Sequence, residues 1–246
     1  MAYIRPEDAI HKSFLNRLLI EIADQPYLAH NLAFKGGTCA AMLGYLDRFS
    51  VDLDFDALSG AEKGTLRKEF HRIFEQLGYT VMRELEKGLF FQLRYPSQPG
   101  KRNTLKVSAS DWVVKANQYR VQYFSDIDRM LKSQTIETMV ANKLVAVTDR
   151  YQQHKTIAGR DIYDIHHFLV HGYSYHPTII EERTGLEPKV YLKQLVAFIR
   201  DNVTATIINE DLNSLLPNQQ FRQIRKVLIP ETISLLVMEC ERLDTR

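Results

Sequence analysis

The chain has 246 residues, of which 45% are hydrophobic and 25% charged, with a formal net charge of +2. This balance is typical of a globular protein and excludes disordered, collagen-like and low-complexity classes, and no run approaches the ~18 apolar residues of a membrane span. The charged N-terminus does not resemble a signal peptide, and the only two cysteines cannot form a disulfide framework, so we expect a cytoplasmic protein.

The first half of the chain alternates between helical and strand-like patterns. Apolar residues at helical spacing predict three helices, over residues 6–24, 38–46 and 61–78. Strand patterns occur at LAFK, at residues 51–55, and at TVMRELE, LFFQLRY, TLKVSAS and VQYFSDI. Turn signals at Gly88 and at PSQPGKRN separate the later strands.

From Ile136 onward the pattern predicts helices only. They cover residues 136–152, 160–171, 177–183, 188–202 and 231–243. We therefore expect two domains. Residues 1–132 would form a sheet lobe with an N-terminal helix, and residues 133–246 a helical lobe that completes the active site.

The densest chemical signal is FKGGTCAAMLGYLDRFSVDLDFD, residues 34–56. Gly36 and Gly37 lie between a predicted strand and helix, where glycine lets the backbone approach a bulky ligand. Thr38 opens the helix, whose free N–H groups and positive dipole end suit a phosphate. No Gly-Lys-Ser/Thr follows at the required spacing, so this is not a P-loop.

Asp52 and Asp54 are two apart on a predicted strand, so their side chains share one face. Adjacent carboxylates repel each other unless a cation lies between them. Hard oxygen ligands of this kind suit Mg²⁺, which would also bridge the phosphates of a nucleotide. A Gly-Gly turn or an Asp-x-Asp pair alone is usually structural, but their order here predicts a nucleotide and metal site.

These motifs resemble the polymerase-β-like nucleotidyltransferase superfamily, whose signature is a Gly-Gly or Gly-Ser helix start followed by Asp-x-Asp or Asp-x-Glu. Lys-Gly-Gly-Thr at 35–38 and Arg-Phe-Ser-x-Asp-Leu-Asp-Phe at 48–55 are similar to the AbiEii-type toxins of abortive-infection and toxin–antitoxin pairs, which have the MenT toxins as relatives. The resemblance implies an α+β fold, in which a polymerase-β-like mixed sheet lobe precedes a helical lobe.

A second charged group begins the helical part of the chain. Lys143 and Arg150 are seven residues apart and lie on one helical stripe. Arg160, Asp161 and Asp164 start the next predicted helix. In nucleotidyl transfer, cations neutralise the triphosphate and the developing pyrophosphate charge. A structural alternative stays open, because Arg160 and Asp164 are four apart and could form a surface pair.

The resemblance assigns functions to this group. It implies catalytic roles for Lys143 and for Asp161, the first aspartate of Arg-Asp-x-x-Asp. It implies nucleotide binding by Lys35, Gly36, Gly37, Thr38, Ser50, Lys143 and Arg160. The superfamily often adds a third carboxylate from a neighbouring strand, where this chain has Ser108. This leaves open a two-carboxylate metal site, rescue by Asp161, or weakened catalysis.

We therefore expect a Mg²⁺-dependent nucleotidyltransferase with Asp52 and Asp54 as metal ligands. An acceptor hydroxyl would attack the α-phosphate of a nucleoside triphosphate, and pyrophosphate would leave. The resemblance implies an RNA acceptor, with the 3′ end of tRNA as the candidate, and a toxin paired with a cognate antitoxin such as a winged-helix repressor. The alternatives are a non-catalytic nucleotide-binding regulatory module on the same fold and a sugar-nucleotide transferase.

Overall fold

The structure is a computed structural model, and it describes residue 5, residues 8–97 and residues 102–244. The chain forms two compact units. Unit 1 consists of Met1–Val113 and Gln118–Thr135, and unit 2 consists of Val114–Asn117 and Ile136–Arg246. All strands of the described residues belong to unit 1, while unit 2 contains helices. The predicted α+β class is confirmed.

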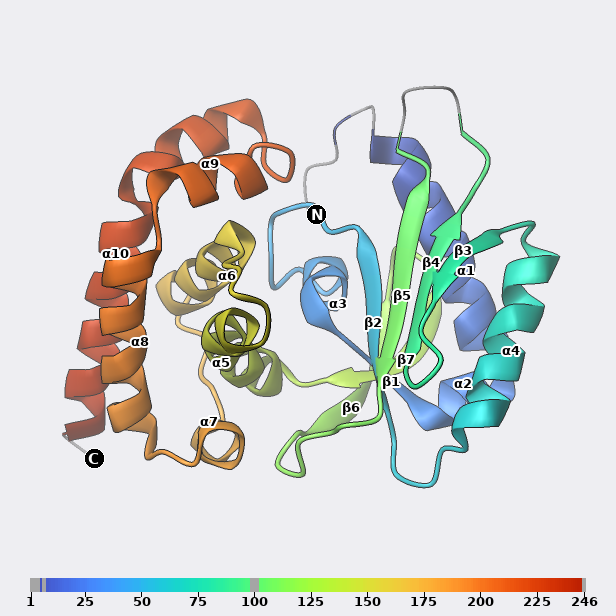
Figure 1. The fold of residues 1–246 in the computed structure, drawn as a ribbon, viewed down its shortest axis with the longest axis horizontal. Coiled ribbons are helices and arrows are strands. Elements are labelled where there is room, and N and C mark those ends of the chain that lie inside the picture. Colours follow the sequence, from blue (N-terminus) through green and yellow to red (C-terminus); the bar gives the residue numbers. More distant parts are fainter. Residues whose placement is uncertain (1–4, 6–7, 98–101, 245–246) are drawn as a thin grey trace. The chain divides into compact units, whose positions relative to one another are not determined.

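A seven-stranded mixed sheet forms the framework of unit 1, with the strand order β3-β4-β5-β2-β1-β7-β6 (Figure 1). The strands are β1 (Leu32–Lys35), β2 (Asp52–Ala57), β3 (Thr80–Glu84), β4 (Leu89–Arg94), β5 (Thr104–Ser110), β6 (Tyr119–Phe124) and β7 (Arg129–Gln134). The central strand β2 pairs antiparallel with β1 and parallel with β5. The strand that carries the two aspartates is therefore held from both sides.

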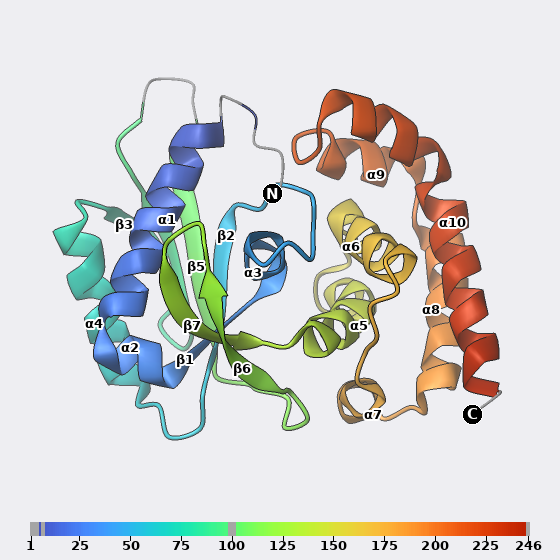
Figure 2. The same ribbon diagram turned by 180° about the vertical axis from the view of Figure 1, so that it is seen from behind.

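The described helices of unit 1 pack on this sheet. They are α1 (Ala9–Asp24), α2 (Pro26–Asn31), α3 (Gly36–Met42) and α4 (Lys63–Gln76). Figures 1 and 2 show α1 and α4 on one side of the sheet and α3 on the other. The ring centroids of Phe70 on α4 and Phe91 on β4 are 5.4 Å apart, and both rings are buried. This packing covers one face of β4 and β5.

The boundaries of two early helices differ from the prediction. The helix predicted over 38–46 begins instead at Gly36 and ends at Met42. Gly44 takes a φ of +78°, and a left-handed residue of this kind stops a helix. The predicted start of the first helix, residues 6 and 7, lies outside the described residues, and α1 begins at Ala9.

The last strand, β7, is not predicted from the sequence. It forms a hairpin with β6, and Asp128 in the turn takes a φ of +54°. Ser133 and Gln134 are polar, yet both are buried. Because buried polar residues interrupt the alternation of apolar and polar positions, the strand pattern of this segment is weak.

Unit 2 is an assembly of helices: α5 (Ile136–His154), α6 (Gly159–Val170), α7 (Pro177–Thr184), α8 (Pro188–Asn202), α9 (Ala205–Leu212) and α10 (Asn218–Asp244). The last one is longer than predicted, because Pro230 lies inside it rather than before it. Gly159 allows α6 to approach α9, since a Cβ there would lie 2.9 Å from the carbonyl oxygen of Ile207. None of the described helices meets the length and hydropathy needed to cross a membrane.

Candidate active site

The turn between β1 and α3 brings two glycines against the side chains of the motif. Gly36 has a φ of +80°, and a Cβ there would lie 3.0 Å from Oδ2 of Asp54. At Gly37 a Cβ would lie 2.7 Å from Nη2 of Arg48 and 3.1 Å from Oγ of Ser50. Glycine is thus needed at Gly36 for both conformation and space, and at Gly37 for space alone.

Thr38 and Arg48 hold the chain around the two aspartates. The buried hydroxyl of Thr38 donates a hydrogen bond to the carbonyl oxygen of Asp52 at 2.5 Å. Arg48, which is 2% exposed, donates from Nη1 to the carbonyl oxygen of Phe49 at 3.0 Å. Thr38 therefore ties α3 to β2 through its side chain, and its contribution to phosphate binding would come from the N–H groups of the first helical turn.

Asp54 lies beside the strand position at which the resemblance led us to expect a third carboxylate. It lies opposite Ser108 in the parallel pairing of β2 with β5. The Ser108 hydroxyl donates to Oδ1 of Asp54 at 2.6 Å. Asp52 lies opposite Lys106 in the same pairing. The neighbouring strand thus supplies a hydroxyl and a cation beside the two carboxylates.

Sequence analysis missed a third aspartate on the same face of β2. Asp56 is 1% exposed and accepts hydrogen bonds from Lys35 Nζ at 2.5 Å, Tyr119 OH at 2.9 Å and Gln134 Nε2 at 2.7 Å. The predicted strand ended at Phe55, although the two-residue period already pointed to the next aspartate. Lys35, which the resemblance assigned to nucleotide binding, is paired with this carboxylate in unit 1.

The donor set at Asp52 and Asp54 fits Mg²⁺ together with a substrate. Among the described residues, no three His, Cys, Asp or Glu side chains form a group able to hold a metal ion. Mg²⁺, however, is commonly held by one or two carboxylates plus substrate phosphates and water. Ser108 bonds one oxygen of Asp54, and the missing Cβ of Gly36 leaves space beside the other. The two residues therefore match this mode of coordination.

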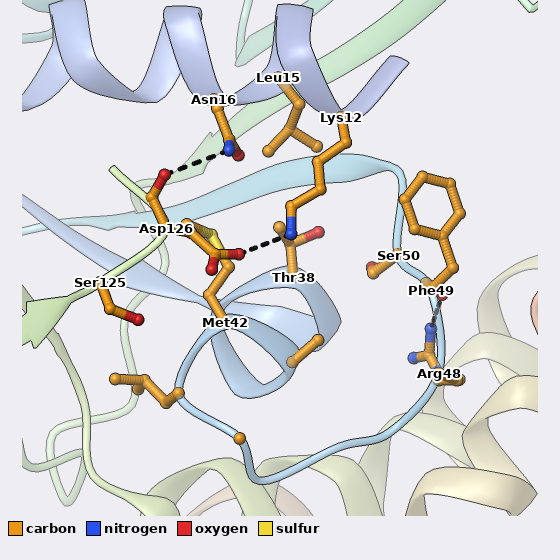
Figure 3. A pocket seen from close by; sticks show the side chains of 13 residues that line it. Lys12, Leu15, Asn16, Thr38, Met42, Arg48, Phe49, Ser50, Ser125 and Asp126 are labelled. Atoms are coloured by element: carbon orange, nitrogen blue, oxygen red, sulfur yellow. Dashed lines mark hydrogen bonds and ion pairs between the residues drawn. The ribbon is translucent and has the colours of Figure 1, made fainter. Parts of the chain in front are cut away.

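A cavity of about 290 Å³ lies beside the motif in unit 1 (Figure 3). Its lining includes Thr38 and Ser50, but neither Asp52 nor Asp54. An ion pair between Lys12 Nζ and Asp126 Oδ2, 2.7 Å long, contributes to its wall. The cavity therefore adjoins the motif through Thr38 and Ser50, while the two carboxylates lie outside its lining.

The second predicted group assembles within unit 2. Lys143 Nζ lies 2.8 Å from Oδ1 of Asp161 and 3.0 Å from Oδ2 of Asp164. Arg150 Nε lies 3.1 Å from Oδ2 of Asp161. Asp161 and Asp164 are 1% and 0% exposed. The shared helical stripe of Lys143 and Arg150 is confirmed, because both cations on α5 reach the same carboxylate on α6.

The environment of Asp161 decides which role this carboxylate can take. Burial acts to raise its pKa, but the charges of Lys143 and Arg150 outweigh burial and lower the pKa to about 2. An effective general base has a pKa near the working pH. Asp161 is ionised throughout the physiological range and is suited to orienting the two cations, not to accepting a proton.

Arg160 and Asp164 do not form the surface pair that their spacing allowed. Asp164 is buried against Lys143. Arg160 instead contacts Asp211 on α9, with Nη1 3.1 Å from Oδ1 and the backbone N–H donating to Oδ2 at 2.9 Å. The predicted pairing of these two residues with each other is therefore wrong, because each side chain pairs with a different residue.

A family comparison decides the assignment of the chain. Residues 17–232 match the family model of the nucleotidyl transferase AbiEii toxin of type IV toxin–antitoxin systems. The chain belongs to the AbiEii nucleotidyltransferase toxin family. The predicted resemblance to the AbiEii-type toxins is confirmed. Membership of this family makes the protein a nucleotidyltransferase, and the alternative of a non-catalytic nucleotide-binding module is not supported.

Solved structures support the fold of this AbiEii-family chain. JHP933 from Helicobacter pylori is 20% identical with a TM-score of 0.61, and the match covers 99% of this chain and 96% of JHP933. MenT4, a nucleotidyltransferase toxin from Mycobacterium tuberculosis H37Rv, is 16% identical with a TM-score of 0.50, covering 97% of this chain and 88% of MenT4. No curated protein matches the sequence significantly.

Proposed function

We propose that this AbiEii-family enzyme transfers a nucleotide from a nucleoside triphosphate to a hydroxyl of an RNA acceptor in a Mg²⁺-dependent reaction. The observation that carries the proposal is the pair of carboxylates on β2, flanked by Gly36 and by the hydroxyl of Ser108. A nucleotidyltransferase needs a surface that holds a metal ion and a triphosphate together. Two carboxylates next to a glycine turn and the first turn of a helix supply such a surface.

In this proposal Asp52 and Asp54 hold Mg²⁺ together with the phosphates. Bound there, the ion would neutralise phosphate charge and polarise the α-phosphate. The Ser108 hydroxyl fixes one oxygen of Asp54, and the backbone at Gly36 and Gly37 approaches the phosphates closely, since no side chain intervenes. The chain itself thus positions the triphosphate for attack by an acceptor hydroxyl.

Family membership supports assigning Lys143 and Arg160 to the charge of the triphosphate and the departing pyrophosphate. Within unit 2, Asp161 and Asp164 hold Lys143, and Asp161 also holds Arg150. A cation that is already oriented stabilises developing charge without reorganising at the moment of reaction. Asp161 acts as a positioning residue in this scheme.

We further propose the 3′ end of tRNA as the acceptor and a cognate antitoxin, such as a winged-helix repressor, as the partner. A type IV toxin family supports a toxin that is controlled by a second protein. Two free and buried cysteines fit a cytoplasmic site of action.

The test incubates the purified chain with total RNA and each labelled nucleoside triphosphate in turn, with Mg²⁺ or with a chelator. We expect label in a tRNA-sized species, with one or a few of the triphosphates, only when Mg²⁺ is present. Label in chelated samples would refute the metal dependence. Absence of label in RNA for all four triphosphates, with a small-molecule acceptor labelled instead, would refute the RNA acceptor.

A further inference from the structure

The sheet of unit 1 has one covered face and one open face at β3, β4 and β5. On the covered face, the alternate residues of β4 and β5 are almost fully buried: Leu89, Phe91, Leu93, Leu105, Val107 and Ala109. On the open face, Arg83, Arg94 and Lys106 are exposed and Phe90 is half-buried. Because this is the face of Asp54, the open surface adjoins the carboxylate pair of the proposed function.

Strand registers connect this open face to the two aspartates in ordered rows. One row runs from Asp54 through Ser108 to Phe90. Figure 1 shows β5 next to β2, with β4 and β3 beyond it. Since neighbouring strands lie about 4.8 Å apart, Phe90 stands on the order of 10 Å from Asp54 across the sheet.

A second row carries the positive charge. It runs from Asp52 through Lys106 and Gln92 to Arg83. Lys106 is one strand from Asp52, and Arg83 is three strands away, on the order of 15 Å. Arg94 lies next to this row, opposite Thr104 on β5. The cations therefore extend from the carboxylate pair to the edge of the sheet.

These cations lack the acidic partners that neutralise others in the same unit. The side chains of Arg83, Arg94 and Lys106 form no hydrogen bond or ion pair with any residue that the structure describes, although their backbones pair within the sheet. No Asp or Glu of β3, β4 or β5 lies on the open face, where the described residues are basic, aromatic or neutral. By contrast, Lys35 is paired with Asp56 and Arg72 with Glu69. An unpaired local row of cations suits a polyanion.

We propose that the open face of β3, β4 and β5 is a track for single-stranded RNA that leads to the carboxylate pair. Arg83, Arg94 and Lys106 contact successive phosphates, and Phe90 stacks on an unpaired base. Phe90 is half-buried, and its ring contacts no aromatic ring among the described residues. A paired base in a duplex cannot reach such a platform, which favours single strands. The inference rests on the proposed function, since it names how that site receives its acceptor.

The experiment measures binding of a fluorescein-labelled single-stranded RNA by fluorescence anisotropy across a salt series, using the full chain. The test variant carries Arg83→Ala, Arg94→Ala and Lys106→Ala. The control variant carries Lys68→Ala, Arg200→Ala and Lys226→Ala, which remove the same charge from exposed positions on α4, α8 and α10. Circular dichroism verifies that all proteins are folded.

Each lost phosphate contact should reduce the slope of log affinity against log salt by about 0.7, so the test variant should lose about 2 from the slope. At about 0.1 M salt its affinity should fall on the order of 100-fold. The control variant should retain the slope of the wild type. Phe90→Leu should weaken binding about 5- to 150-fold without changing the slope, because stacking is not ionic.

Equal slopes and affinities for the test and control variants would overturn the track. Wild-type affinity of Phe90→Leu would overturn the stacking contact. Failure of the proposed function gives a different result: the wild type would bind RNA through the three cations yet transfer no nucleotide to any RNA. If the wild type transfers nucleotide to RNA and the test variant binds RNA as tightly as the control variant does, the track is refuted but the proposed function is not.

Discussion

Replacing Lys143 with alanine should destabilise the protein as well as reduce transfer. Lys143 is shared by two carboxylates that are 1% and 0% exposed, Asp161 and Asp164. Removing one partner of a buried pair costs about 3–5 kcal/mol. Because Arg150 still contacts Asp161, we expect the lower end, about 3 kcal/mol. For a chain of this length that corresponds to a fall of roughly 6–12 °C in Tm.

The loss of stability in Lys143→Ala should depend on pH and should become smaller as the pH falls. Burial acts to raise the pKa of Asp161, but the cations outweigh it and leave the folded pKa at about 2. That is below the unfolded value of about 3.9. The stabilisation is therefore present above about pH 4 and is lost as pH falls towards 2. The difference in stability between wild type and Lys143→Ala should narrow over the same interval.

The assay is thermal unfolding followed by circular dichroism from about pH 7 down to about pH 2. Lys193→Ala, which removes an exposed lysine from α8, is the matched control and should leave Tm within about 1 °C. An unchanged Tm for Lys143→Ala at neutral pH would refute the reasoning about the buried cluster. A large fall in Tm with full transfer activity would refute the role of Lys143 in the reaction.

Five further substitutions separate structural from functional roles. Asp56→Asn should cost on the order of 3 kcal/mol, because it disrupts a buried carboxylate paired with a lysine, whereas Asp54→Asn should leave stability nearly unchanged; urea titration measures both. Gly36→Ala and Gly44→Ala should each lose about 1–2 kcal/mol from positive φ, but only Gly36→Ala should also impair transfer, because no atom lies within 4 Å of a Cβ at Gly44. Gly159→Ala should cost about 1–3 kcal/mol by forcing α6 from α9, and an unchanged unfolding midpoint would contradict that close contact.

The sequence is informative where local geometry determines the outcome. The two-residue period put Asp52 and Asp54 on one face, and the structure places both on the same face of β2. The seven-residue spacing of Lys143 and Arg150 put both on one stripe, and both reach Asp161. The shared face of the two aspartates and the shared stripe of the two cations each follow from a single strand or helix and need no tertiary contact.

Relations between distant segments could not be derived in the same way. The partner of Lys143 at Asp164 and the pairing of Arg160 with Asp211 depend on how α5, α6 and α9 pack. The role of Asp56 depends on Tyr119 and Gln134, which approach β2 only in the folded sheet. For the same reason, the sequence alone does not show that Lys143 is paired with two buried carboxylates, and so it does not predict the loss of stability expected for Lys143→Ala.

Loss of the carboxylate pair tests the central proposal most directly. The measurement compares incorporation of labelled nucleotide into RNA by the wild type and by Asp52→Asn with Asp54→Asn, at saturating Mg²⁺. We expect Mg²⁺-dependent incorporation by the wild type and background incorporation by the double variant, with Tm unchanged or raised, because two repelling carboxylates are removed. Equal incorporation by two equally folded proteins would contradict the assignment of Asp52 and Asp54 as the metal and nucleotide site.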